Sequence, residues 1–375
     1  MRIGFIDWMC NPARPGASGL SDIVWSMAHH LVSAGDEVHV FGPYSVDFNS
    51  HGVHVHRFKL PPLGYRNILG HSLIAVKAIL EANRAGPWDI IHAPEYLTTA
   101  LCTILMPGTP VVLTVPGNIF ERIANINHFD RYTTQVYKMA ARLTARKSKA
   151  IIATSQIQAQ WWAYSGAIPK RIVTIPLGVD TNTFKPGKIK TTENVLFIGR
   201  LQRENGADLA IKAFAHVKAV LPHSTLTIVG DGSDRENLIT LTEKLNLSGS
   251  ICWIDRINYE ELPAIYQSAQ VFLFPRLSRV TPRVLFEAMA CGLPVVTSSI
   301  GGINDFVVNG ETGFLENPHD YVAVAQRVVE LLKNPELSEQ MSQNARRIAE
   351  NKLDWNVIVS QVRSEVYKPL LESRK

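Results

Sequence analysis

The stretch VFLFPRLSRVTPRVLFEAMACGLPVVTSS, residues 271 to 299, decides the fold class. It joins two short apolar runs, VFLFP and PVVTSS, through an arginine-rich loop and one short helical segment. Two apolar strands separated by a helix predict parallel pairing, because parallel strands need a crossover connection. Uninterrupted apolar runs are typical of strands that are covered by helices on both faces.

The same alternation of strand and helix runs through both halves of the chain. Strand-like runs include RIGFID, EVHVFG, DIIHA, PVVLTV and AIIATS in the first half, and NVLFIGR, TLTIVGDG and SICWID in the second. A connector rich in Pro, Gly, Asp, Asn and Thr separates the halves at residues 175–193. The sequence therefore predicts an α/β protein with two doubly wound, Rossmann-like domains that join near residue 187 and enclose a cleft at the carboxyl ends of their strands.

Composition agrees with this organisation. The 375 residues exceed what one core usually organises, and 46% hydrophobic with 19% charged residues is typical of a globular protein. The net charge of +5 is too small to favour nucleic acid as a partner, and the four scattered cysteines predict neither a zinc site nor a disulfide framework. Without a secretory signal or an apolar run long enough to span a bilayer, we expect a cytoplasmic protein, free or at the inner face of the membrane.

The loop and helix of the quoted stretch carry its charges. Thr281 is predicted to cap the helix and Pro282 to be its first residue. A helix N-terminus with Arg279 and Arg283 beside it would bind an anion such as a nucleotide diphosphate. Glu287 lies one turn beyond Arg283, and an ion pair on a solvated helix face is the alternative for these two residues.

Other loops contain further candidates. Arg200, in GRLQRENG, follows the first strand of the second half and could donate bidentate hydrogen bonds to phosphate oxygens. The alternative is an arginine that lies on the surface without a ligand. His92 ends the strand DIIHA and is either a residue of the site or a satisfied core histidine. His54 and His56 share one face of a strand, where a solvated face is the alternative to a metal pair.

Common cofactor signatures are missing from the sequence. The loops NPARPGASGL and VGDG lack the GxGxxG spacing, which disfavours a nicotinamide enzyme. There is no Asp-x-Asp pair to hold a divalent cation against phosphates. We therefore expect no cofactor and no metal, with arginines and helix ends neutralising the charge of the diphosphate.

Taken together, these motifs resemble the family 4 glycosyltransferases of the GT-B fold, which are retaining enzymes that use nucleotide sugars. The resemblance covers nearly the entire chain and depends on the order of its stretches. These are the glycine loop ending at Ser18-Gly19, IPLGVDTNTFKP, FIGRL, IVGDG, YEELPAIYQSAQVFLFP, FEAMACGLPVV and GGINDFVVNGETGFL.

The resemblance implies roles for individual residues. Arg200 would bind the donor diphosphate, Glu287 the ribose hydroxyls, and residues 254–256 would lie near the base. The implied donor-binding set is Ser18, Gly19, Arg200, Asn205, Ile254, Asp255, Arg256, Arg279, Thr281, Arg283 and Glu287. The candidates for catalysis are Arg200, Arg279 and His92, and those for sugar or acceptor contact are Glu95 and Asn118.

The chain departs from the family pattern in four places. Asn205 and Pro116 stand where the family usually has lysine and histidine, Arg279 replaces a glutamate, and the turn VTP at residues 280–282 replaces GFG. A cation lost at Asn205 and gained at Arg279 would keep positive charge beside the diphosphate. Because a guanidinium only donates hydrogen bonds, sugar recognition at Arg279 would differ from that of the family.

The resulting prediction is a metal-independent, retaining glycosyltransferase that moves a hexose from a UDP-sugar such as UDP-glucose to a glycan or polysaccharide precursor. The alternative is a degenerate relative that only binds nucleotide sugars or glycans. The predicted domains are 1–187 on the acceptor side, 188–354 for the nucleotide sugar, and 355–375, whose helix crosses back onto the first domain.

A basic stripe is predicted on one helix of the first domain. Lys138, Arg142 and Arg146 repeat at every fourth residue within the segment 131–150. Such a stripe could contact anionic lipid or a lipid-linked acceptor, and a solvated face is the alternative.

Overall fold

The computed structural model describes residues 1–7, 19–44, 46–59, 68–114, 131–187, 193–255 and 257–374. Contacts divide the chain into two compact units, Met1–Gly178 with Trp355–Lys375, and Val179–Asp354. The division lies earlier than residue 187 because the start of the connector folds with the second unit. There, Val179 donates its backbone N–H to the carbonyl of Leu353 at 2.8 Å.

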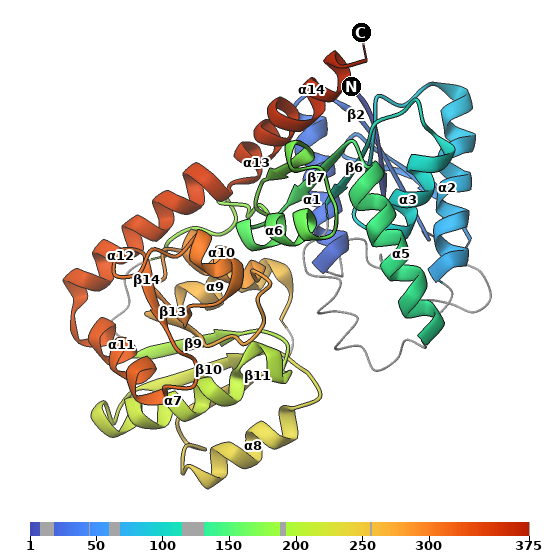
Figure 1. Ribbon diagram of the computed structural model, residues 1–375. Helices are drawn as coiled ribbons and strands as arrows, with labels where there is room; N and C mark the ends of the chain where they lie inside the picture. The colour runs from blue at the N-terminus through green and yellow to red at the C-terminus, as the bar shows by residue number, and fades with distance from the viewer. Residues whose placement is uncertain are drawn as a thin grey trace. The chain divides into compact units, whose positions relative to one another are not determined.

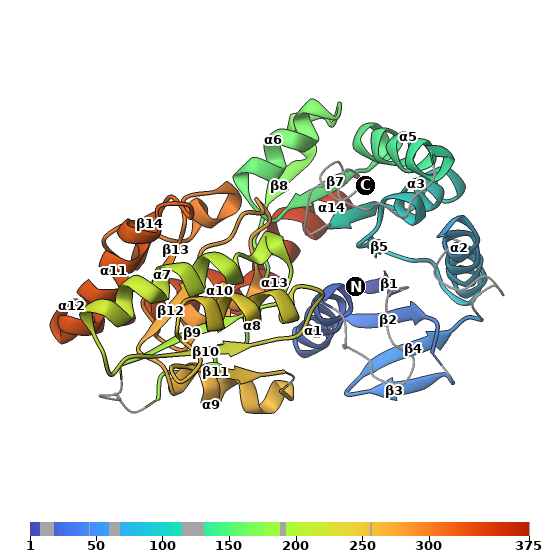
Figure 2. The same ribbon diagram turned by 90° about the horizontal axis from the view of Figure 1, so that it is seen from below.

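The first unit is built on a sheet with the strand order β3-β4-β2-β1-β5-β6-β7-β8, in which only the β3–β4 pair is antiparallel (Figure 2). Its elements are β1 (Arg2–Ile6), α1 (Gly19–Ser33), β2 (Glu37–Gly42), β3 (Phe48–Ser50), β4 (Val53–Arg57), α2 (Ile68–Ala85), β5 (Ile90–Ala93), α3 (Tyr96–Leu105), β6 (Val111–Thr114), α5 (Arg131–Lys147), β7 (Ala150–Ala153), α6 (Gln156–Tyr164), η2 (Pro169–Arg171), β8 (Ile172–Thr174), α13 (Trp355–Gln361), η7 (Val362–Tyr367) and α14 (Lys368–Glu372). Strands β5, β6 and β7 are buried along their whole length, as expected for parallel strands between two helix layers.

Helices α2, α3 and α5 lie side by side in one layer of the first unit (Figure 1). Helix α13 instead packs against α1. The segment from Trp355 onward therefore belongs to the first unit. Among the helices that the structure describes, none combines the length and the hydropathy needed to cross a bilayer.

The second unit has the strand order β11-β10-β9-β12-β13-β14, and all its strand pairs are parallel. Its elements are β9 (Asn194–Ile198), η3 (Arg203–Asn205), α7 (Ala207–Val220), β10 (Thr225–Val229), α8 (Arg235–Lys244), β11 (Ile251–Ile254), η4 (Tyr259–Glu261), α9 (Leu262–Gln267), β12 (Val271–Phe274), α10 (Arg283–Ala290), β13 (Val295–Ser298), η5 (Gly301–Asp305), β14 (Gly313–Glu316), α11 (Tyr321–Lys333), α12 (Pro335–Ile348) and η6 (Ala349–Leu353). The first strand, β9, lies between β10 and β12, so the direction of winding reverses there. This is the topological switch point at which doubly wound sheets bind ligands.

Candidate functional site

The loops that follow β9 and β12 interlock at the carboxyl edge of the second sheet. Gly206 has a φ of +75°, and a Cβ atom there would overlap the carbonyl oxygen of Pro275. Gly230, after β10, has a φ of +144°, and a Cβ atom there would overlap the carbonyl oxygen of Gly199. Three neighbouring strand ends therefore meet with their backbones in close contact, which only glycine permits at these positions.

Asn205 joins two of these loops through its side chain. Its buried amide donates from Nδ2 to the carbonyl of Arg200 at 2.7 Å, and its Oδ1 accepts from Nη1 of Arg276 at 2.6 Å. Arg200 itself is exposed. The structure thus brings together Arg200 and Asn205 from the expected set with Arg276, an arginine of the predicted anion-binding loop that the expected set did not include.

Helix α10 begins one residue later than predicted. Pro282 is its N-cap with φ −85° and ψ 141°, and Arg283 is the first helical residue. The prediction of Thr281 as the cap was wrong, because the extended backbone of Pro282 shifts the first turn by one position. The proline side chain of the N-cap residue makes no capping hydrogen bond. The Thr281 hydroxyl is buried just before the N-terminus without a hydrogen-bond partner among the described residues, so this end of the helix retains donors for an anion.

Glu287 is held by two neighbours. Its Oε1 lies 3.6 Å from Nη2 of Arg283, and its Oε2 accepts from the hydroxyl of Tyr266 at 2.8 Å. Only 5% of Glu287 is exposed, so the alternative of a solvated ion pair does not hold. Burial and the charge of Glu287 raise the pKa of Tyr266 well above its usual range, which keeps this phenol a donor. Sequence reasoning missed Tyr266, since only its place in the motif YEELPAIYQSAQ marks it.

The other expected donor-site residues lie on the rim of this edge. Arg279 is exposed, and its carbonyl accepts from the N–H of Gly302 at 3.2 Å. Ile254 is half-buried, while Asp255 is exposed and forms an ion pair of 2.5 Å with Arg235. The cation that contacts Asn205 is therefore Arg276 rather than Arg279. The remaining two expected donor-site positions, Ser18 and Arg256, lie outside the described residues, and Gly19 begins α1.

In the first unit, His92 has both ring nitrogens engaged. Nδ1 lies 2.6 Å from the Tyr367 hydroxyl and Nε2 lies 2.6 Å from the Thr114 hydroxyl, while the ring stacks on Phe5 at 4.9 Å. Burial lowers the pKa of His92 to about 3, so the imidazole is neutral at physiological pH. Of the two roles considered for His92, this geometry favours the satisfied core histidine.

Glu95 serves as the N-cap of α3. Its carboxylate accepts from the backbone N–H groups of Leu97 and Thr98, both at 2.7 Å, and burial raises its pKa. A carboxylate used in this way stabilises the helix start, and its oxygens are directed at the backbone. Asn118, the other expected sugar or acceptor contact, and Pro116 lie outside the described residues.

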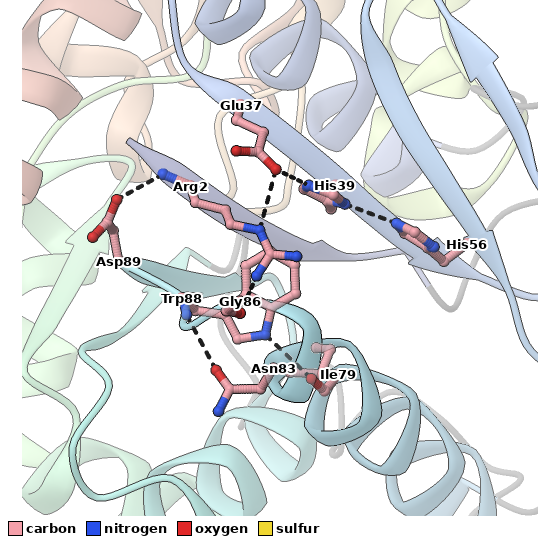
Figure 3. Close-up of polar contacts among 9 residues, drawn as sticks. All are labelled: Arg2, Glu37, His39, His56, Ile79, Asn83, Gly86, Trp88 and Asp89. Atoms are coloured by element: carbon pink, nitrogen blue, oxygen red, sulfur yellow. Dashed lines mark hydrogen bonds and ion pairs between the residues drawn. The ribbon is translucent and has the colours of Figure 1, made fainter.

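His39 of β2 and His56 of β4 are joined by a hydrogen bond (Figure 3). His39 bonds through Nε2 to Glu37 and through Nδ1 to Nε2 of His56, both at 2.8 Å, and His54 stacks on His39 at 4.8 Å. Because Glu37 accepts, Nε2 of His39 donates, and its Nδ1 accepts from His56 when both rings are neutral. No three His, Cys, Asp or Glu side chains in the described part of the chain are grouped to hold a metal ion.

Asp7 was not predicted and lies directly after β1, at the switch point of the first sheet. Its Oδ2 accepts from Ser21 at 2.6 Å and from Tyr44 at 2.9 Å, while its buried Oδ1 has no hydrogen-bond partner in the part of the chain that the structure describes. Burial raises its pKa to about 6. The single aspartate in FID carries no sequence signal for this environment, because Tyr44 is 37 residues away.

On α5, Arg142 and Arg146 are exposed and Lys138 is half-buried, so the predicted basic stripe exists on the surface. Met139 lies among these side chains with 68% of its surface exposed. The opposite face of the helix, with Tyr137, is buried in the core of the first unit.

Comparisons with known proteins agree with these observations. The model described as "Glycosyltransferase Family 4" matches residues 17–183, and that described as "Glycosyl transferases group 1" matches residues 179–348. A glycogen synthase of Mycobacterium tuberculosis is 25% identical over 96% of this chain and 93% of its own length. Among solved structures, a sucrose-phosphate synthase from Thermosynechococcus elongatus has a TM-score of 0.83 at 21% identity, covering 99% of both chains.

The Anabaena protein Alr3699/HepE, solved in complex with UDP-glucose, has a TM-score of 0.76 at 20% identity and covers 98% of this chain and 100% of its own. These likenesses show the GT-B fold, with its two parallel-sheet α/β domains. The two family models together span both halves of the sequence. The chain therefore belongs to the family 4 glycosyltransferases of the GT-B fold.

Proposed function

We propose that this glycosyltransferase moves a hexose from a UDP-sugar to a glycan, polysaccharide precursor or lipid-linked acceptor, with retention of configuration. The observation that carries the proposal is the cationic edge of the second sheet, where Arg200, Arg276 and the N-terminus of α10 follow adjacent strands. The relative solved with UDP-glucose makes that sugar nucleotide the first donor to test.

The reaction breaks the bond between the anomeric carbon of the sugar and the β-phosphate oxygen, so the diphosphate leaves with additional negative charge. Guanidinium groups and helix N–H donors that are already oriented stabilise this charge in the transition state. The buried Thr281 hydroxyl supplies a further donor at the end of α10. We propose Glu287 for the ribose hydroxyls, since Tyr266 and Arg283 hold its carboxylate in place.

We propose that no metal ion is required. The arginines and the helix end supply the positive charge for which other enzymes use a divalent cation. Turnover that is unchanged after dialysis against a chelator would support this point. Loss of turnover that magnesium or manganese restores would overturn it, while leaving the glycosyltransferase assignment intact.

A calorimetric panel of UDP, GDP, ADP and their hexose derivatives tests the donor. At 100 times its dissociation constant, a ligand should stabilise the protein by about 2.7 kcal/mol. Release of UDP from UDP-glucose, with and without glycan acceptors, then tests the reaction. Absence of binding by every nucleoside diphosphate would contradict the proposal.

The second candidate is a degenerate relative that binds nucleotide sugars or glycans without transfer. It is favoured by the neutral Asn205 in place of the family lysine and by Arg279 in place of a glutamate. Tight UDP-glucose binding without UDP release, across a panel of acceptors, would establish it.

We also propose that the α5 stripe of Lys138, Arg142 and Arg146 contacts anionic lipid at the cytoplasmic face of the membrane, with Met139 inserting between the headgroups. Sedimentation with vesicles containing phosphatidylglycerol at two salt concentrations tests this. Binding should weaken with salt, because the interaction is between screened charges. Equal sedimentation with neutral and anionic vesicles would count against it.

A further inference from the structure

Arg276 is held at the edge of the second sheet by a side chain from a different loop. Its Nη1 donates to Oδ1 of Asn205 at 2.6 Å, across 71 residues of sequence. Asn205 is 4% exposed, and its Nδ2 donates to the carbonyl of Arg200 at 2.7 Å. The two partners fix the orientation of the amide, because a guanidinium can only donate and a carbonyl can only accept. Asn205 therefore fixes Arg276 and the Arg200 loop together.

The backbone on either side of Arg276 is also fixed. The N–H of Arg276 bonds to the carbonyl of Phe274 at 2.8 Å, and the N–H of Leu277 bonds to the carbonyl of Glu204 at 3.0 Å. The guanidinium carbon lies 5.8 Å from the centroid of the Phe274 ring. An arginine held in this way loses less conformational freedom on binding a ligand than a mobile surface arginine would.

Arg276 follows β12 and Asn205 follows the neighbouring β9, so the pair lies at the switch point of the sheet. Ligands of doubly wound sheets bind at this point, and phosphate groups among them need cationic donors. The side chain of Asn205 is neutral, so this bond orients the guanidinium without bringing a negative charge from Asn205.

We infer that Arg276 binds the diphosphate of the donor and that Asn205 is the residue that positions it. This inference depends on the proposed function, since it names a ligand contact within that site. It replaces the expectation that Arg279 supplies the cation missing at Asn205. Arg279 is exposed, whereas Arg276 makes the contact with Asn205.

Calorimetry on the full chain tests the inference with a series of uridine and guanosine ligands: nucleoside, monophosphate and diphosphate. For the base that the wild type prefers, Arg276→Gln should weaken diphosphate binding roughly ten- to a hundredfold, as expected for a charge-assisted hydrogen bond. Affinity for the nucleoside should stay unchanged. Arg347→Gln, at an exposed position of α12, is the matched control and should leave both affinities unchanged.

A double-mutant cycle tests the positioning role. Asn205→Ala should weaken diphosphate binding in the wild-type background, and the loss should be smaller when Arg276→Gln is already present. Additive losses would show that Asn205 does not act through Arg276. Arg276→Lys keeps the positive charge but loses the planar guanidinium that can donate two parallel hydrogen bonds. Its affinity for the diphosphate should therefore lie between those of Arg276→Gln and the wild type, and its binding should be more sensitive to salt than that of the wild type.

The outcomes separate this inference from the proposed function. If the wild type binds no nucleoside diphosphate, the proposed function fails. If the wild type binds and Arg276→Gln binds equally well, only the inference fails. Equal losses for nucleoside and diphosphate would mean that Arg276 supports the fold of the loop, and this result would also overturn the inference.

Discussion

Replacing Asp7 or His92 should change the pH dependence of stability in opposite directions. Both residues lie at the switch point of the first sheet, after β1 and near the end of β5. Burial raises the pKa of Asp7 from 3.8 to about 6 and lowers that of His92 from 6.5 to about 3. The variants Asp7→Asn and His92→Gln remove the two titrations one at a time.

The sign follows from which state holds the proton. Between pH 3.8 and about 6, folded Asp7 keeps a proton that the unfolded chain has released, so the free energy of unfolding falls as the pH rises. The shift of about two units corresponds to about 3 kcal/mol. Below pH 6.5 the unfolded chain protonates His92 while the folded protein does not, so the free energy of unfolding falls by about 1.4 kcal/mol per pH unit as the pH drops. Between pH 4 and 6 the two effects nearly cancel in the wild type.

Urea unfolding between pH 4 and 7, followed by tryptophan fluorescence, measures both effects. Six of the seven tryptophans belong to the first unit, so the signal reports mainly on its unfolding. Relative to the wild type, Asp7→Asn should gain about 3 kcal/mol from pH 4 to pH 7, and His92→Gln should lose a similar amount over the same range. Glu81→Gln, at an exposed position on α2, controls for the loss of a carboxyl group. A stability difference for Asp7→Asn that does not vary with pH would refute the reasoning from burial.

Three further substitutions test the second unit. Tyr266→Phe removes the hydrogen bond to Glu287 and should weaken UDP binding about three- to tenfold in calorimetry. Unchanged affinity would show that Glu287 does not bind the ribose hydroxyls. Gly206→Ala places a Cβ atom against the carbonyl of Pro275 at a positive φ. It should lower the free energy of unfolding of the second unit by about 2 to 4 kcal/mol, measured by urea unfolding followed by circular dichroism. A loss below about 1 kcal/mol would contradict the close approach of the two backbones. Arg346→Met leaves three backbone carbonyls without their donor and should cost about 2 to 4 kcal/mol in the same measurement, while a neutral effect would show that water replaces the guanidinium.

The fold follows from local features of the sequence. Strands β12 and β13 and helix α10 are read from apolar runs and from helix periodicity, and the same rules apply in both halves. The error at Thr281 is of the same local kind, since Thr281 and Pro282 each suit the start of a helix and sequence alone does not decide between adjacent registers.

The side-chain contacts around the two switch points could not be predicted in this way. His92 contacts Tyr367 across 275 residues, and Arg276 contacts Asn205 across 71. No periodicity connects such pairs, because the topology of the sheet brings them together. The sequence could therefore propose His92 for two roles, and only its two hydrogen bonds distinguish between them.

The two sheets show why strand order alone does not determine a site. Strands β4-β2-β1-β5-β6-β7 and β11-β10-β9-β12-β13-β14 follow the same order outward from their first strands, so each sheet has a switch point with the same topology. In the first sheet that point carries Asp7 and His92, whose burial disfavours the charged form of each. In the second it carries Arg276 and Arg200 beside a neutral Asn205. Among the residues that the structure describes, the second arrangement is the one with guanidinium groups beside the switch point, so the chemistry of the side chains, rather than the shared topology, supports our proposal that the second unit binds the donor diphosphate.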